Sequence, residues 1–268
     1  MIRVDLVKVL PRYCRILNKC DLVTSEDMTA DYGKQSTISP QSCQRRYAIS
    51  YLLDDGDIGE SAFIAPATPA FEDAFAALGR GSILQRPDGP VAVEDLLPGD
   101  DVMLCGGSFA RLLWCGVMTL NPPSATHNPS RLALTRITAE ALGVGRPMQD
   151  LILGPAARLH HCATGISKLI GSPDAYIPAS DFVDGDHFIA LRPTMPVDLY
   201  HLGFATHETL LVNGIGVESL HPGTAFSLGL RGEALAQYRA LFPHLCRLED
   251  VGLPKHPRLR LPDLAFFN

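Results

Sequence analysis

Hydrophobic and polar residues alternate along residues 45–65, RRYAISYLLDDGDIGESAFIA, and this period of two predicts strands. An Asp-Gly pair interrupts the alternation in the middle of the stretch, and the run SAFIA follows it. The residues at every second position of the first run are Tyr47, Ile49, Tyr51 and Leu53. Two such runs on either side of Asp-Gly predict a β-hairpin.

Two stretches have the pattern of helices. In TPAFEDAFAALG, residues 68–79, Thr68 can cap the first turn, Pro69 fits that turn, and Gly79 can end the helix. In RGEALAQYRALF, residues 231–242, the apolar side chains gather on one side, which predicts an amphipathic helix.

Between these helices the chain is a succession of short apolar runs separated by Gly, Pro and Asp, which predicts a compact all-β body. We therefore expect a mainly β fold with an added N-terminal hairpin and helix and an added C-terminal helix. The expected parts are a poorly ordered or irregular segment 1–44, a hairpin with a short helix at 45–79, a β body at 80–223, and a helix with a tail at 224–268.

Composition and charge narrow the class of protein. The chain has 268 residues and a formal net charge of −6, so we expect no binding of nucleic acid and no attraction to anionic membranes. Residues 1–46 hold eight Lys and Arg against five Asp and Glu, and this mildly basic segment fits a solvated surface.

The seven cysteines and the N-terminal sequence indicate the cellular compartment of the protein. The cysteines are odd in number and form no C-x-x-C pair, which argues against a disulfide framework and against a zinc ribbon. The first twenty residues do not have the pattern of a secretory signal, and no run of about 18 apolar residues predicts a membrane span. We expect a cytoplasmic protein, with signal-independent export left open.

Three segments, in this order, carry a resemblance to a known family. They are GRGSILQRPDGPVAVEDLLPGDDV, DLILGPAARL and YHLGFATHETLLVNGIGVESLHPG. Together they resemble the Hint domain, the module shared by hedgehog autoprocessing domains and inteins, and are most similar to the bacterial Hint-type domains. The resemblance implies a pseudo-symmetric, horseshoe-like all-β fold whose ends meet at the active site.

The resemblance also implies a chemistry, and two positions lack the residues for it. In the family a Cys or Ser attacks the carbonyl of the preceding residue, and a His protonates the amide nitrogen that leaves. The nucleophile position falls on Ala77 and the position of the activating His falls on Ala157. Neither methyl group can form an acyl ester or transfer a proton.

The third segment retains more of the polar residues of the family motif than the first two segments do. His207 falls on the family's hairpin histidine, His201 falls where Asp or Asn is common, and Asp198 is close by. Glu218 and Ser219 stand where inteins have a terminal His-Asn pair. The interpretation that polar residues simply end a hairpin remains open for His201 and His207.

We therefore expect a processing-deficient Hint domain that acts as a structural or interaction module, with a protein partner possible. The first alternative is autoprocessing through another nucleophile, such as Ser82 or Cys105, although Ser82 fits a backbone hydrogen bond at a strand start. A weaker alternative is a hydrolase that reuses the cleft for a separate substrate.

We expect no cofactor and no metal. A zinc site from His160, His161, Cys162 and the hairpin histidines would need convergence over long range. The acidic runs DFVDGDH and DDGDIGE lack the twelve-residue pattern of an EF-hand and fit turns.

Overall fold

The computed structural model describes residues 44–122, 133–163, 166–167 and 171–264. The predicted irregular segment 1–44 lies outside this part of the chain, apart from Gln44. None of the helices in the described ranges is both long and apolar enough to cross a membrane.

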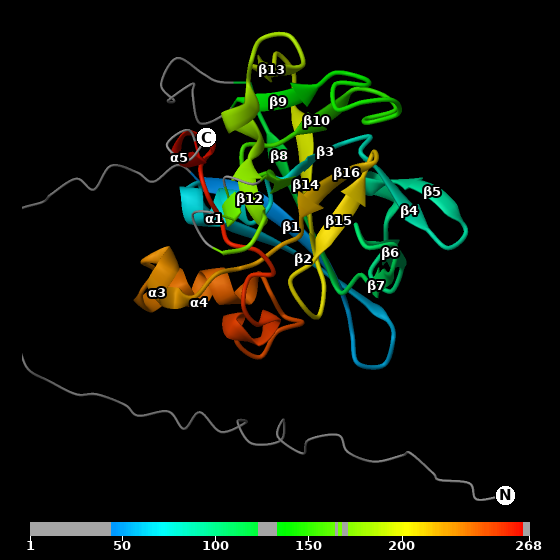
Figure 1. Cartoon of the computed structure of the whole chain (residues 1–268). Coiled ribbons are helices and arrows are strands. Elements are labelled where there is room, and N and C mark those ends of the chain that lie inside the picture. The colour runs from blue at the N-terminus through cyan, green and yellow to red at the C-terminus, as the bar shows by residue number, and fades with distance from the viewer. Residues whose placement is uncertain (1–43, 123–132, 164–165, 168–170, 265–268) are drawn as a thin grey trace, which may run out of the picture. The chain divides into compact units, whose positions relative to one another are not determined.

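The largest element is an eight-stranded sheet, in which every pair of neighbours is antiparallel (Figure 1). Its strand order is β13-β9-β10-β3-β14-β8-β1-β2. The bounds of these strands are β1 Gln44–Leu52, β2 Ile58–Pro66, β3 Leu78–Gly79, β8 Trp114–Leu120, β9 Leu134–Ile137, β10 Leu151–Leu153, β13 Phe188–Leu191 and β14 Val197–Gly203.

Smaller sheets and short helices complete the architecture. A four-stranded sheet has the order β12-β11-β16-β15, and two hairpins are formed by β4 with β5 and by β6 with β7. The strand bounds are β4 Ile83–Arg86, β5 Gly89–Ala92, β6 Asp101–Met103, β7 Phe109–Arg111, β11 Arg158–Cys162, β12 Asp174–Pro178, β15 Thr209–Val212 and β16 Ile215–Glu218. The helices are α1 Pro69–Asp73, α3 Ala225–Leu228, α4 Gly232–Ala240 and α5 Leu261–Leu264, with 3-10 turns η1 Val93–Asp95, η3 Ala179–Phe182 and η4 Leu248–Val251. The predicted mainly β fold is confirmed.

The predicted N-terminal hairpin is part of the large sheet. β1 pairs with β2 along its whole length, and its other edge pairs with β8, with Ile49 opposite Gly116. The hairpin therefore extends the central sheet through backbone hydrogen bonds.

The helix predicted over residues 68–79 is wrong in its extent. α1 ends at Asp73, and Leu78 lies in β3, where it pairs with β10 on one side and β14 on the other. Pairing with two strands satisfies backbone groups that a longer helix would have used, so tertiary structure overrides the local helical tendency.

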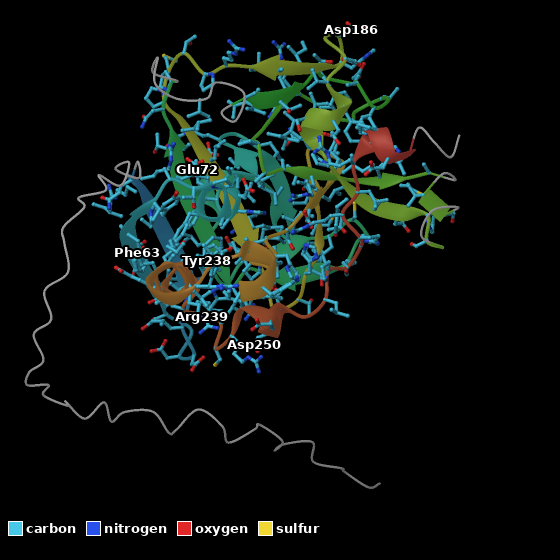
Figure 2. All side chains as sticks on the ribbon, turned by 90° about the vertical axis from the view of Figure 1, so that its left-hand side faces the viewer. Phe63, Glu72, Asp186, Tyr238, Arg239 and Asp250 are labelled. Carbon is cyan, nitrogen blue, oxygen red and sulfur yellow. The ribbon has the colours of Figure 1, made fainter. Side chains whose placement is uncertain are left out.

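The predicted C-terminal helix is present as α4, and it packs on the same side of the sheet as α1 (Figure 2). Tyr238 meets Phe71 edge to face, with ring centroids 5.4 Å apart. The Trp114 indole Nε1 donates to the carbonyl of Leu241 at 2.8 Å. These contacts fix both flanks on a shared aromatic core.

Candidate functional site

Ala77 lies fully buried in the middle of the large sheet. Its N–H donates to the carbonyl of Tyr200 (3.3 Å), and its own carbonyl accepts from the N–H of Gly154 (2.8 Å). The carbonyl of Ala76 accepts from the N–H of Ala156 at 2.9 Å. The peptide group between Ala76 and Ala77 is therefore hydrogen-bonded at both its oxygen and its nitrogen, away from water.

Gly154 allows this close approach. A Cβ at residue 154 would overlap the carbonyl carbon and oxygen of Ala76. Any side chain there would push the two backbones apart, so only glycine fits at this position.

Ala157 follows in the same turn and is also buried. Its N–H donates to the carbonyl of Gly154 at 3.1 Å, and its carbonyl accepts from Ala179 at 2.9 Å. Ala77 and Ala157 belong to one apolar cluster. The structure thus buries the methyl groups of Ala77 and Ala157, the two positions that the motif alignment predicts for a nucleophile and a proton donor.

Ser82 and Asp198 make local contacts. The Ser82 hydroxyl is buried and donates to the carbonyl of Gly79 at 2.7 Å. Asp198 accepts from the Thr119 hydroxyl at 2.7 Å, and this bond is exposed to solvent. Among the described residues, no hydrogen bond or ion pair joins either side chain to His201 or His207.

Cys105, the other alternative nucleophile, lies in the turn after β6. Its N–H donates to the carbonyl of Thr209 at 2.9 Å. Partial burial raises the pKa of its thiol, and the charges of Lys255 and Arg146 only partly offset this. A thiol with a raised pKa is a poor nucleophile near neutral pH.

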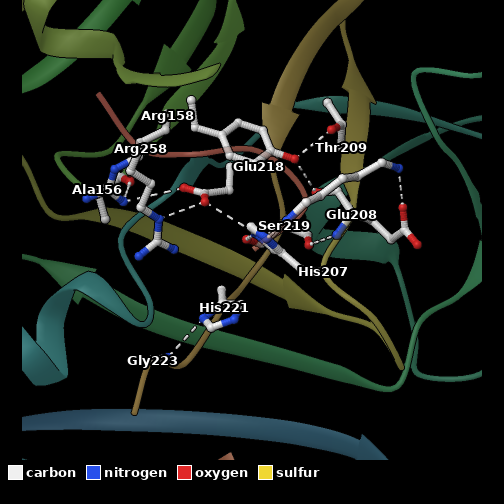
Figure 3. A network of polar contacts seen from close by, with 12 residues as sticks. Ala156, Arg158, His207, Glu208, Thr209, Glu218, Ser219, His221, Gly223 and Arg258 are labelled. Atoms are coloured by element: carbon white, nitrogen blue, oxygen red, sulfur yellow. Dashed lines mark hydrogen bonds and ion pairs between the residues drawn. The ribbon is translucent and has the colours of Figure 1, made fainter. Parts of the chain in front are cut away.

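A buried charge cluster forms around Glu218, whose side chain is 4% exposed (Figure 3). Arg258 Nε donates to the carboxylate at 2.8 Å, and Arg158 Nη1 lies at 3.5 Å. His207 Nε2 lies on the other side, at 3.2 Å. Burial alone would raise the pKa of Glu218, but the hydrogen bond from His207 and the two arginine charges outweigh it and lower the pKa to about 2.

The ring of His207 has a defined orientation. Its Nδ1 accepts from the backbone N–H of Lys255 at 3.0 Å, so the ring proton is on Nε2. That proton faces Glu218 and the carbonyl of Ser219 (3.3 Å). Both ring nitrogens of His207 therefore have partners within this network.

His201 lies in β14, opposite Gly116 of β8, and its ring is enclosed. Burial lowers its pKa to about 4, although the charge of Glu218 acts in the opposite direction. Its Nδ1 has no hydrogen-bond partner among the described residues. His201 is therefore neutral at pH 7, and together with His207 it lies within electrostatic reach of Glu218.

The last part of the described chain covers this cluster. Residues 252–260, here called the C-terminal strap, run along β12, where Tyr176 donates to the carbonyl of Pro257 (2.8 Å) and accepts from Leu259 (3.0 Å). Three basic side chains of the strap pair with acids of the body. They are Lys255 with Glu208 (2.6 Å), Arg258 with Glu218 (2.8 Å) and Arg260 with Asp181 (2.7 Å).

Sequence reasoning missed Glu218 as the centre of a network, together with Arg158 and Arg258. One signal was present in the sequence, because Glu218 lies in the short apolar run GVESL, and a carboxylate that is buried with such a strand needs a cationic partner. The identity of the partners was not readable, since they lie 60 and 40 residues away along the chain.

Comparison with known proteins identifies a shared domain. The sequence profile of the Hint domain matches residues 76–224. Similar solved structures include a bacterial intein-like domain from Clostridium thermocellum (11% identity, TM-score 0.37, covering 54% of this chain and 99% of that one). Others are a variant of the gp41-1 intein (13%, 0.32, 54% and 99%) and the MchDnaB-1 intein (14%, 0.34, 54% and 100%). No curated protein matches the chain.

Proposed function

The chain belongs to the Hint family, and from this premise we propose that its Hint domain does not cleave the peptide bond before Ala77 and serves as a structural or interaction module. The observation that carries the proposal is the fully buried methyl group of Ala77, the residue that the motif alignment predicts at the position of the family nucleophile. Without a thiol or hydroxyl at that position, no acyl intermediate can form on the Ala76 carbonyl.

The second support is the environment of the amide nitrogen. Its hydrogen is held by the carbonyl of Tyr200 at 3.3 Å, and the activating position is the buried Ala157. No acid among the contacts of this peptide can protonate the nitrogen as the bond breaks, so the amine would be a poor leaving group.

The third support comes from the two flanks. The hairpin β1–β2 is paired with β8, and the strap is held by Arg258 and by Arg260. A flank that shares a sheet with the domain would stay attached even after a backbone cut, because many hydrogen bonds would still hold it. This arrangement suits a lasting assembly in which the Hint body joins the two flanks.

The alternative nucleophiles gain no support from their contacts. The Ser82 hydroxyl is used in the bond to Gly79, and the Cys105 thiol has a raised pKa.

Intact mass tests the proposal. We expect the purified full chain to keep its mass over days with and without a thiol or hydroxylamine. Appearance of fragments 1–76 and 77–268 would contradict the proposal. Fragments cut next to Ser82 or Cys105 would instead favour the alternative nucleophiles.

A gain-of-function variant sharpens this test. The N–H of Ala156 already donates to the Ala76 carbonyl (2.9 Å), and such a donor can stabilise an oxyanion. We therefore expect Ala77→Cys to yield slow, thiol-dependent cleavage into 1–76 and 77–268, detected by mass after denaturation. Ala76→Cys, equally buried but one position away, is the matched control and should stay intact.

A further inference from the structure

Two histidines and an aspartate meet where the strap crosses the outer edge of the four-stranded sheet. His160 belongs to β11, Asp174 to β12, and His256 to the strap. Each offers a ligand atom, and these atoms all lie within 4.8 Å of one another. His160 Nε2 is 3.0 Å from Asp174 Oδ1, and the two imidazole centroids are 4.9 Å apart.

We propose that His160, Asp174 and His256 bind a late first-row divalent metal ion, with zinc as the ion of choice, and that this ion fastens the C-terminal strap to the β body. Two imidazole nitrogens and one carboxylate oxygen are a common protein ligand set for zinc and leave a fourth position for water. Late first-row ions also bind nitrogen-rich sites more tightly than early ones do.

The sheet register brings the first two ligands together. Tyr176 stands opposite His160, and Asp174 stands opposite Cys162, so His160 and Asp174 are diagonal neighbours on one face. His161 points to the opposite face and packs against Phe182 at 5.5 Å, which excludes it from the site.

Tyr176 holds both imidazoles in place. Its ring meets His160 edge-on at 6.3 Å and His256 edge-on at 5.2 Å. Its own hydroxyl is fixed by Thr209 at 2.6 Å. The ligands are thus oriented by a buried aromatic ring, as metal ligands are by the groups around them.

The site remains open to solvent. The His160 and Asp174 side chains are 25% and 30% exposed, so an ion can reach them. A metal ion would take the place of the hydrogen between His160 Nε2 and Asp174 Oδ1, and the three ligand atoms already lie within 4.8 Å of one another.

Binding of a metal ion at this site would stabilise the whole C-terminal strap. Only His256 comes from the strap, whereas the other two ligands belong to the body. An ion that binds all three therefore stabilises the closed strap by mass action. The neighbouring strap residue Lys255 contacts His207, and Arg258 contacts Glu218, so the same ion would favour closure over the buried charge cluster.

Titration of the full chain with Zn²⁺ and with Co²⁺ tests the site. We expect saturable binding of one ion with a Co²⁺ spectrum free of thiolate charge transfer, because the ligands are nitrogen and oxygen. His256→Gln and Asp174→Asn should each weaken Zn²⁺ binding by at least about tenfold. His161→Gln, on the same strand but the opposite face, is the matched control and should bind as the unchanged chain does.

A second measurement follows the strap itself. Zn²⁺ should slow hydrogen exchange at the amide of Leu259, and this protection should be lost in His256→Gln. Thermal unfolding of each variant without metal verifies that it is folded. Unchanged Zn²⁺ affinity in both ligand variants, a Co²⁺ spectrum with thiolate charge transfer, or no binding at micromolar zinc would each overturn the proposal. These readouts do not depend on whether the chain cleaves itself.

Discussion

The N–H of Ala156 donates to the carbonyl oxygen of Ala76, and this bond joins the turn after β10 to the segment that leads into β3. The same two segments meet again where Gly154 donates to the carbonyl of Ala77. The contact therefore locks the start of the Hint domain into the centre of its own sheet. The strength of this contact depends on how closely the two backbones approach.

Gly154→Ala should destabilise the fold strongly. The added Cβ would overlap the backbone of Ala76, and separating the segments would weaken two hydrogen bonds. Overpacking of a tight interior costs about 1–3 kcal/mol, and we expect the upper part of that range. Urea unfolding measures the change. Gly106→Ala is the control, since a Cβ there meets nothing within 4 Å, and an equal loss in both variants would contradict the explanation.

Ser82 provides a test that separates a structural role from a catalytic one. Ser82→Ala should cost about 1 kcal/mol of unfolding free energy, because one buried hydrogen bond is lost while the Ser82 N–H still donates to Gly79 (3.1 Å). Ser82→Cys should remain intact by mass in the presence of a thiol. Thiol-dependent cleavage of Ser82→Cys would show that this position can act as the nucleophile.

Glu218 should contribute more to the unfolding free energy than a surface ion pair does. Glu218→Gln would leave Arg158 and Arg258, which are 28% and 37% exposed, beside a neutral amide, and the loss of a charged hydrogen-bond partner costs about 1.5–3 kcal/mol. Chemical unfolding measures this loss. Glu249→Gln removes the exposed pair with Arg247 and should change stability by less than about 1 kcal/mol. Similar effects of the two substitutions would argue against a structural role for the cluster.

The sequence is informative where local pattern and turn chemistry agree. The hairpin around Asp54 to Gly56 and the helix ending near Leu241 follow from periodicity alone. The helix expected up to Gly79 failed because β10 and β14 compete for the same backbone groups. A local pattern cannot register partners that lie more than seventy residues away along the chain.

The candidate site likewise contains positions that the sequence predicts and positions that it does not predict. Alignment with the family motif predicts Ala77 and Ala157 as the positions of interest, because motif spacing is local. The convergence of His160 with Asp174 and His256 depends on the pairing of β11 with β12 and on the path of the strap. The zinc site weighed from the sequence combines His160 with His161, Cys162 and the hairpin histidines, and it does not include Asp174 or His256. The division into segments 1–44, 45–79, 80–223 and 224–268 stays a prediction.

Acid should weaken the fold through His201. Burial lowers its pKa to about 4 from an ordinary value near 6.5, so between these values the unfolded chain holds a proton that the folded chain does not. Unfolding then takes up a proton, and stability falls as the pH falls from about 6.5 to about 4. The full shift corresponds to a loss of about 3 kcal/mol. Below about 4.5, Glu218 adds a further loss, because its folded pKa is about 2.

Unfolding free energies measured at several pH values between 7 and 4 would check this, with His201→Asn compared against the unchanged chain. The variant has no titrating group at residue 201, so its stability should depend less steeply on pH in that range. Half-buried His244, whose pKa burial also lowers to about 4, is retained in both proteins, and its contribution should cancel in the difference. Parallel curves for the two proteins would mean that His201 takes up its proton equally well in the folded state, contrary to its enclosed position in β14.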